Sequence, residues 1–188
     1  MDALEALERS RAGFGRRLEA VESTDWARST PCSEFTVRDL ANHVVAGCRV
    51  YTLLLSGAPA AEAVSIKWTD KSGPELLADW TVVGGEMMAG FRAPGALSGI
   101  VHHPAGDLPG EMLAGMRVTE FTLHGWDIAR TVGGDEALDT GVVEWLLPVL
   151  TPRMPEFVAA GYFRAPSGPI GDDAPPQAKL LHLTGRHP

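Results

Sequence analysis

Apolar residues recur every three or four positions along most of this chain, a spacing that predicts helices with one buried face. The first such stripe opens the chain and comprises Leu4, Leu7, Phe14, Leu18 and Val21. A second helix is predicted from Thr36 to about Leu55, because Thr36-Val-Arg-Asp39 has the sequence of a capping box. Apolar residues cover most of the circumference of this helix, so we expect it to be largely buried.

Further helices are predicted over residues 74–91, 109–133 and 139–148. The second of these ends at the glycine pair Gly133–Gly134, a common helix C-terminus, and the third is expected to kink or end at its proline. Residues 178–186, AKLLHLTGR, are expected to add one or two helical turns.

The remaining segments are rich in glycine and proline. Residues 94–110 are predicted to form a long loop with at most a short strand at 99–101. Residues from about 165 to 188 are predicted to form a tail that wraps around the helices. No internal repeat divides the chain, so the pattern predicts an all-α fold in one domain that covers residues 1–188.

The helix predicted over residues 109–133 carries two polar residues on its apolar stripe. On helical geometry one face comprises Leu113, Met116, Glu120, His124, Asp127 and Ile128. The apolar members indicate that this face is directed to the core, so Glu120 and His124 are expected to point inward. An unpaired buried carboxylate costs several kcal/mol. A metal ion is a suitable partner, because it accepts both a carboxylate oxygen and an imidazole nitrogen.

A metal site needs at least one more ligand, and His43 is the best candidate. It lies on the edge of the apolar face of the most buried helix, with Gly47 one turn later. Three protein ligands leave one coordination position open, which is the pattern of catalytic zinc. Asp127 is placed to accept the other ring N–H of His124 as a supporting residue. Asp39 could support His43 in the same way, although its capping role competes.

Simpler interpretations of these residues stay open. Glu120 and His124 could form an i, i+4 pair on a partly exposed face. His43 could be a core histidine with a satisfied hydrogen bond, and Asp127 a residue near a helix end.

The other metal-binding residue types have plainer interpretations. Cys32 and Cys48 are expected to be small buried hydrophobic residues, and His102–His103 an inert pair in the long loop. If Cys32 or His103 supplied a fourth ligand, the closed site would favour a non-catalytic metal-binding bundle, acting as a sensor or as a structural or interaction module.

Composition and charge limit the function. The 188 residues are 45% hydrophobic and 21% charged, as in typical soluble domains, and the formal net charge of −8 argues against nucleic-acid binding. No apolar run approaches the ~18 residues of a membrane helix. The first twenty residues lack the apolar segment of a signal peptide. The cysteine spacing matches no metal or redox motif, so we expect a cytoplasmic protein with reduced thiols.

Three segments carry a resemblance to a known family. They are TPCSEFTVRDLANHVV, PAGDLPGEMLAGMRVTEFTLHGWDIARTVG and DDAPPQAKLLHLTGRHP. They resemble the metal-binding branch of the mycothiol-dependent maleylpyruvate isomerase N-terminal family, within the DinB/YfiT-like superfamily. The resemblance implies a four-helix bundle with a long crossover loop and a short C-terminal extension. It also implies a metal, usually zinc with nickel as an alternative, held by His43, Glu120 and His124.

The resemblance further implies chemistry on a small-molecule thiol. In that family the metal activates the thiol of mycothiol, which then adds to an electrophile in isomerisation or S-transfer. We therefore expect a thiol transferase or a thiol-assisted isomerase, with small-molecule partners and no nucleic acid or membrane; a homodimer is compatible with the sequence. Phe35 replaces a tryptophan that the family pattern leads us to expect. We also expect the chain to lack the additional domain that supplies an arginine to the isomerases' active site. Strict maleylpyruvate isomerase activity is therefore not expected.

Overall fold

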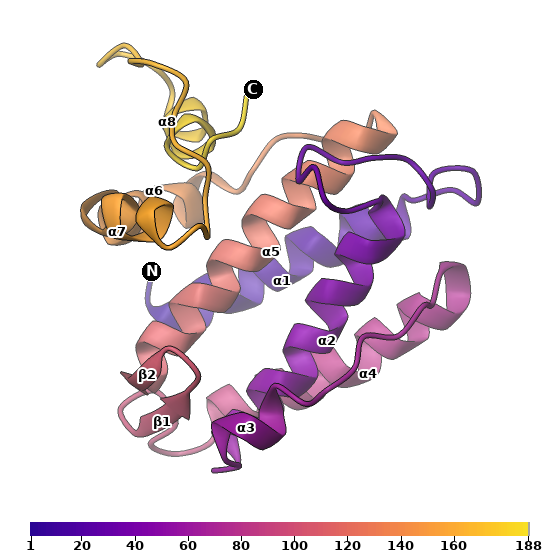
Figure 1. The fold of residues 1–188 in the computed structure, drawn as a ribbon, viewed down its shortest axis with the longest axis vertical. Helices are drawn as coiled ribbons and strands as arrows, with labels where there is room; N and C mark the ends of the chain where they lie inside the picture. Colours follow the sequence, from indigo (N-terminus) through magenta and orange to yellow (C-terminus); the bar gives the residue numbers. More distant parts are fainter. Residues whose placement is uncertain (188) are drawn as a thin grey trace.

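Four long helices make up most of the structure, a computed structural model that describes residues 1–187. They are α1 (Ala3–Glu19), α2 (Val37–Leu55), α4 (Gly73–Arg92) and α5 (Gly110–Val132). Helix α1 packs most extensively on α5 and α2 on α4, with further contacts of α1 with α4 and of α2 with α5. Figure 1 shows α5 and α2 in front, with the more distant α1 and α4 behind them. The prediction of a mostly helical fold is confirmed.

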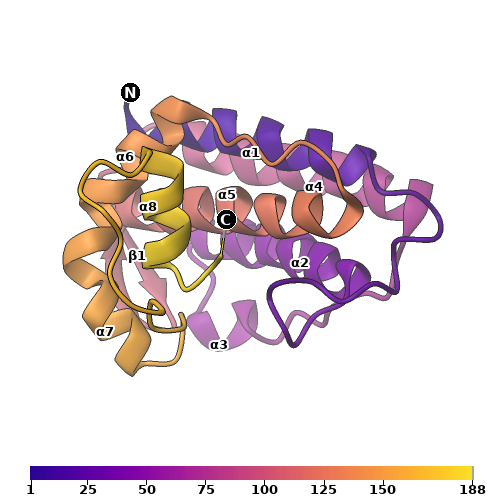
Figure 2. The ribbon, with the colours of Figure 1, turned by 90° about the horizontal axis from the view of Figure 1, so that it is seen from above.

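Shorter elements connect and cover these helices. They are α3 (Ala60–Ala63), β1 (Ile100–His103), β2 (Gly106–Pro109), α6 (Thr140–Leu150), a 3-10 turn (Thr151–Arg153), α7 (Met154–Ala159) and α8 (Pro176–Leu183). Helices α6, α7 and α8 gather at one side of the long helices (Figures 1 and 2). None of the helices within residues 1–187 combines the length and the apolar character needed to span a membrane.

The segment 94–110 differs from the long loop that the sequence predicts. Strands β1 and β2 pair antiparallel there, with Ile100 opposite Pro109 and His103 opposite Gly106. Gly106 has a φ of 118°, a conformation that residues with a Cβ rarely adopt, so it permits the tight reversal between the strands. The prolines and glycines of this segment led to the prediction of a loop, although the segment forms a hairpin.

Local sequence signals fix where the two site-bearing helices begin and end. The Thr36 side chain accepts a hydrogen bond from the Asp39 backbone, and the Asp39 carboxylate accepts one from the Thr36 backbone, which confirms the predicted capping box. Helix α5 ends at Gly133, which adopts a left-handed φ of 72°. Helix α6 continues through Pro148 to Leu150, beyond the predicted break.

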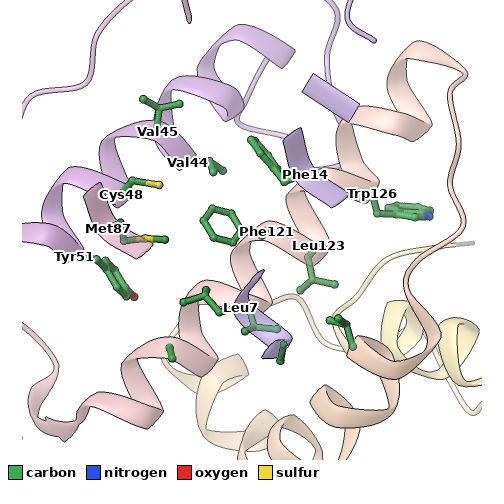
Figure 3. Close-up of a cluster of buried hydrophobic side chains, with 14 of the residues drawn as sticks. Leu7, Phe14, Val44, Val45, Cys48, Tyr51, Met87, Phe121, Leu123 and Trp126 are labelled. Carbon is green, nitrogen blue, oxygen red and sulfur yellow. The ribbon is translucent and has the colours of Figure 1, made fainter. Parts of the chain in front are cut away.

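The core lies between the four long helices. Figure 3 shows Phe121 of α5 among side chains from α1, α2 and α4, including Phe14, Val44 and Met87. All four are completely buried.

An arginine also lies in this core, between α2 and α5. Arg117 is 2% exposed, donates to the backbone carbonyl of Val44 at 3.0 Å and lies over the rings of Tyr51 and Phe121. Gly47 makes room for it, since a Cβ at that position would lie 2.5 Å from Nη1 of Arg117.

The C-terminal tail docks on this framework. Leu180 and Leu181 of α8 are fully buried, and α8 packs against α6. The Gln177 side chain accepts from the backbone of Leu138 at 2.8 Å and donates to that of Glu136 at 2.9 Å. The predicted tail includes residue 188, which lies outside the described residues.

We expect Gly47→Ala to destabilise the protein by about 1–3 kcal/mol, because Arg117 is too buried to move away from the added methyl group. Gly85→Ala is the matched control: it lies in exposed helix with open space at its Cβ and should stabilise by about 0.5–1 kcal/mol. Urea titration measures both, and equal free energies of unfolding for the two variants would contradict this account.

Candidate metal centre

Three side chains from two helices converge at the predicted site. Glu120 and His124 lie one turn apart on α5, and His43 faces them from α2. Oε2 of Glu120 is 3.0 Å from Nε2 of His43 and 3.5 Å from Nε2 of His124. One ligand atom from each residue lies within 4.8 Å of the other two. The Glu120–His124 pair is therefore not isolated on the surface of its helix, because His43 completes it.

The three side chains of this cluster differ in their exposure to solvent. The side chain of His124 is 11% exposed, whereas those of His43 and Glu120 are 29% and 33% exposed. Aromatic rings border His43: Phe35 stacks on its imidazole at a centroid distance of 5.5 Å, and Trp68 meets it edge-on at 5.0 Å. Trp68 is itself half-exposed. We call Phe35 and Trp68 the aromatic rim of the site.

On the buried side, Asp127 holds His124. The Asp127 side chain is completely buried, and its Oδ2 lies 3.1 Å from Nδ1 of His124. Because Nδ1 is engaged in this way, Nε2 is the nitrogen directed at Glu120 and left for a ligand bond. The same carboxylate accepts two hydrogen bonds from Arg186, Nε to Oδ1 at 2.9 Å and Nη2 to Oδ2 at 2.6 Å.

The pKa values show where the site attracts positive charge. Burial opposes the charged form of Glu120, yet the imidazoles of His124 and His43 hold its pKa well below the usual range. Burial also opposes the charged form of His124, but Glu120 and Asp127 outweigh it and raise the pKa of His124 to about 9. The two carboxylates thus favour a positive charge on the imidazole of His124. A carboxylate and two imidazoles are a donor set that suits zinc.

The other residues considered from the sequence lie in different surroundings. Asp39 bonds to Thr36, and no hydrogen bond within residues 1–187 joins it to His43. Cys32 is a half-buried free thiol whose pKa is raised by burial and by the charge of Asp127. His103, on the hairpin, lies against Tyr51 of α2, with ring centroids 6.1 Å apart. In the described part of the chain, neither Cys32 nor His103 joins the three-residue cluster.

Arg186 is the site residue that sequence reasoning missed. It follows α8 in the tail, for which we expected only wrapping, and lies 59 positions after its partner Asp127. No helical period connects residues so far apart. The available signal was the burial of Asp127, which requires a cationic or hydrogen-bonding partner, combined with the small number of cationic residues after α5.

Comparisons with known proteins place the chain in a family. The sequence profile of the family described as "Mycothiol maleylpyruvate isomerase N-terminal domain" matches residues 7–129. This chain belongs to that family. The matched region includes His43, Glu120, His124 and Asp127, whereas Arg186 lies outside it.

Two relatives in Mycobacterium tuberculosis have similar length. The proteins named "Uncharacterized protein MT0763" (strain CDC 1551 / Oshkosh) and "Uncharacterized protein Rv0738" (strain ATCC 25618 / H37Rv) are each 31% identical over 192 residues, which span 99% of this chain and 98% of theirs.

Two crystal structures share the fold. That of the mycothiol-dependent maleylpyruvate isomerase has a TM-score of 0.70 and 16% identity over 98% of this chain and 88% of that one. A histidine-to-alanine mutant of the same enzyme has a TM-score of 0.62 and 16% identity over 85% of this chain and 71% of that one.

The raised pKa of His124 predicts pH-dependent stability in protein treated with a chelator. The imidazole of His124 binds its proton more tightly in the folded state than in the unfolded chain. Its contribution to the free energy of unfolding is therefore complete below about pH 6.5 and is lost as the pH rises towards 9. Urea titrations across this range should show a decline that His124→Gln reduces. If the free energy of unfolding falls equally steeply with pH in wild type and in His124→Gln, His124 is not the group responsible.

Proposed function

We propose that this chain is a metal-dependent enzyme that uses a low-molecular-weight thiol on a small electrophile. The observation that carries the proposal is the cluster of His43, Glu120 and His124, whose ligand atoms lie within 4.8 Å of one another and two of whose side chains are partly exposed. Zinc fits this donor set, with nickel as the alternative.

Each residue has a distinct role in this proposal. Glu120 would supply a negatively charged oxygen, and His43 and His124 neutral nitrogens. The three residues would therefore neutralise only part of the positive charge of a bound dication. When bound, the ion stabilises the thiolate form of a thiol, which is the nucleophilic form. Asp127 fixes the ring of His124 in the tautomer that presents Nε2.

The accessible side determines how the substrates approach. His43 and Glu120 are the partly exposed members of the cluster, so a thiol would enter beside them and past the aromatic rim. In S-transfer, the sulfur forms a bond to carbon, the thiol proton passes to solvent and the leaving group departs with its electron pair. In isomerisation, the sulfur adds to a conjugated double bond, rotation follows, and elimination regenerates both the double bond and the thiol.

The name of the family supports a choice of thiol. This name contains mycothiol, so we propose mycothiol or a similar thiol as the co-substrate. We also propose that α1, α2, α4 and α5 form a DinB/YfiT-like four-helix bundle, with residues 1–188 as one cytoplasmic domain. The pairwise packing of these four helices supports the fold assignment.

Protein produced without a histidine tag should contain about one zinc or nickel ion per chain. His43→Ala and His124→Ala each remove one of three protein ligands and should weaken metal affinity by at least about 100-fold, more than supporting residues do. The matched control is His102→Ala, since His102 is exposed and pairs with Asp107 on the hairpin. Elemental analysis and chelator competition measure these effects; wild-type protein that binds neither ion would refute the metal site.

Calorimetric titration of the zinc-loaded protein with mycothiol, bacillithiol and glutathione tests the thiol. We expect mycothiol to bind and glutathione to bind at least about tenfold more weakly, a difference of about 1.4 kcal/mol. If none of the three binds to metal-loaded protein, the alternative function, a non-catalytic metal-binding sensor or structural module, replaces the proposed one.

A further inference from the structure

The C-terminal tail reaches the candidate metal centre through a buried carboxylate, that of Asp127. Arg186 extends from the end of this tail to Asp127, and Asp127 contacts His124. The side chain of Arg186 is only 10% exposed and that of Asp127 is completely buried. A continuous chain of contacts therefore links the tail, through Asp127, to a residue that we propose as a metal ligand.

The geometry of the ion pair is specific. Nε and Nη2 of Arg186 each donate to a different oxygen of Asp127, at 2.9 Å and 2.6 Å. Such a two-point contact fixes the plane of the carboxylate as well as its position. Because Oδ2 also lies 3.1 Å from Nδ1 of His124, the plane that Arg186 imposes determines the direction in which the imidazole points.

A tight backbone turn at Gly185 precedes Arg186. Gly185, directly before it, has a φ of 72°, and a Cβ built there would lie 2.7 Å from both Cβ and the backbone oxygen of Arg164. Only glycine fits this turn without strain or displacement. Thr184 caps α8 by donating its hydroxyl to the backbone of Leu180 at 2.9 Å, so the turn starts from a fixed point.

The rest of the tail is anchored independently of Arg186. Leu180 and Leu181 are fully buried, and Gln177 bonds to the backbone of the segment between α5 and α6. Loss of the Arg186 guanidinium would therefore leave α8 docked while removing the partner of a buried carboxylate.

We propose that Arg186 is a positioning residue for the metal centre, and that residues 184–186 form a clasp whose docking is thermodynamically linked to metal affinity. The inference rests on the proposed metal binding by His43, Glu120 and His124. Arg186 acts through Asp127 and has no ligand role. Removing a residue that orients a metal ligand at this distance weakens metal affinity by about 10–100-fold. Linkage is reciprocal, so a bound ion stabilises the docked clasp by the same factor.

The first experiment measures zinc affinity by competition with a chromophoric chelator. Arg186→Gln should bind zinc about 10–100-fold more weakly than wild type. Arg186→Lys keeps the charge but loses the two-point contact, so its affinity should fall between the two. Gly185→Ala keeps the arginine but displaces it and should weaken binding in the same direction. Arg130→Gln is the matched control, because Arg130 lies on α5 in an exposed ion pair with Glu136 and should retain wild-type affinity.

The second experiment distinguishes a role through Asp127 from a loss of stability. In a double-mutant cycle, Asp127→Asn and Arg186→Gln should reduce zinc affinity less than additively, because each breaks the same contact. In zinc-loaded wild type, nitrogen NMR should show the His124 Nδ1 proton in a strong hydrogen bond, and this signal should weaken in Arg186→Gln. Hydrogen exchange of residues 176–187 should slow when zinc is added to wild type and change less in Arg186→Gln.

These outcomes separate the inference from the function on which it rests. The clasp would be ruled out if Arg186→Gln and Gly185→Ala bound zinc as tightly as wild type. Fully additive effects of Asp127→Asn and Arg186→Gln on zinc affinity would also rule it out. Neither result would contradict the metal site itself. Wild-type protein that binds no zinc would overturn both. If Arg186→Gln fails to fold, Arg186→Lys and Gly185→Ala decide the question through the same affinity measurement.

Discussion

Helix α5 carries two carboxylates, Glu120 and Asp127, into a largely apolar interior, and the arrangement around them follows from the need to compensate their charge. Asp127 is completely buried and is compensated by Arg186 from the tail and by the imidazole of His124. Glu120 is partly exposed and lies between His124 and His43. One helix thus carries both a closed ion pair, satisfied by the protein itself, and a partly exposed carboxylate that lies between two imidazoles.

This division of charge explains why the site can be both rigid and accessible. Arg186 and Asp127 lie on the buried side, where the interior strengthens their attraction and limits their movement. His43 lies on the accessible side beside Phe35 and Trp68. The orientation of His124 is thereby set by buried groups, while His43 and Glu120 remain partly exposed.

Much of the fold and most of the site could be predicted from the sequence, because their determinants are local. The capping box at Thr36 and the glycine after Val132 mark helix ends by interactions within a few residues. The inward direction of Glu120 and His124 follows from helical periodicity with Leu113 and Ile128. The convergence of His43 required one further assumption, that its helix packs on the helix of Glu120 and His124.

The features that were missed depend on contacts that no local pattern records. The hairpin at 100–109 depends on pairing between two short strands whose proline and glycine are more typical of loops. The position of Arg186 depends on the docking of α8 against α6 and on the turn at Gly185, which are long-range packing events.

The pairing of α1 with α5 also affects how the protein folds. These two helices form the most extensive helix contact, although α2 and α4 lie between them in the sequence. Bringing them together closes a long loop, which costs chain entropy before the contact is rewarded and slows the folding of such topologies. The helix that carries Glu120 and His124 therefore completes its packing only when the N-terminal helix has returned to it from the far end of this loop.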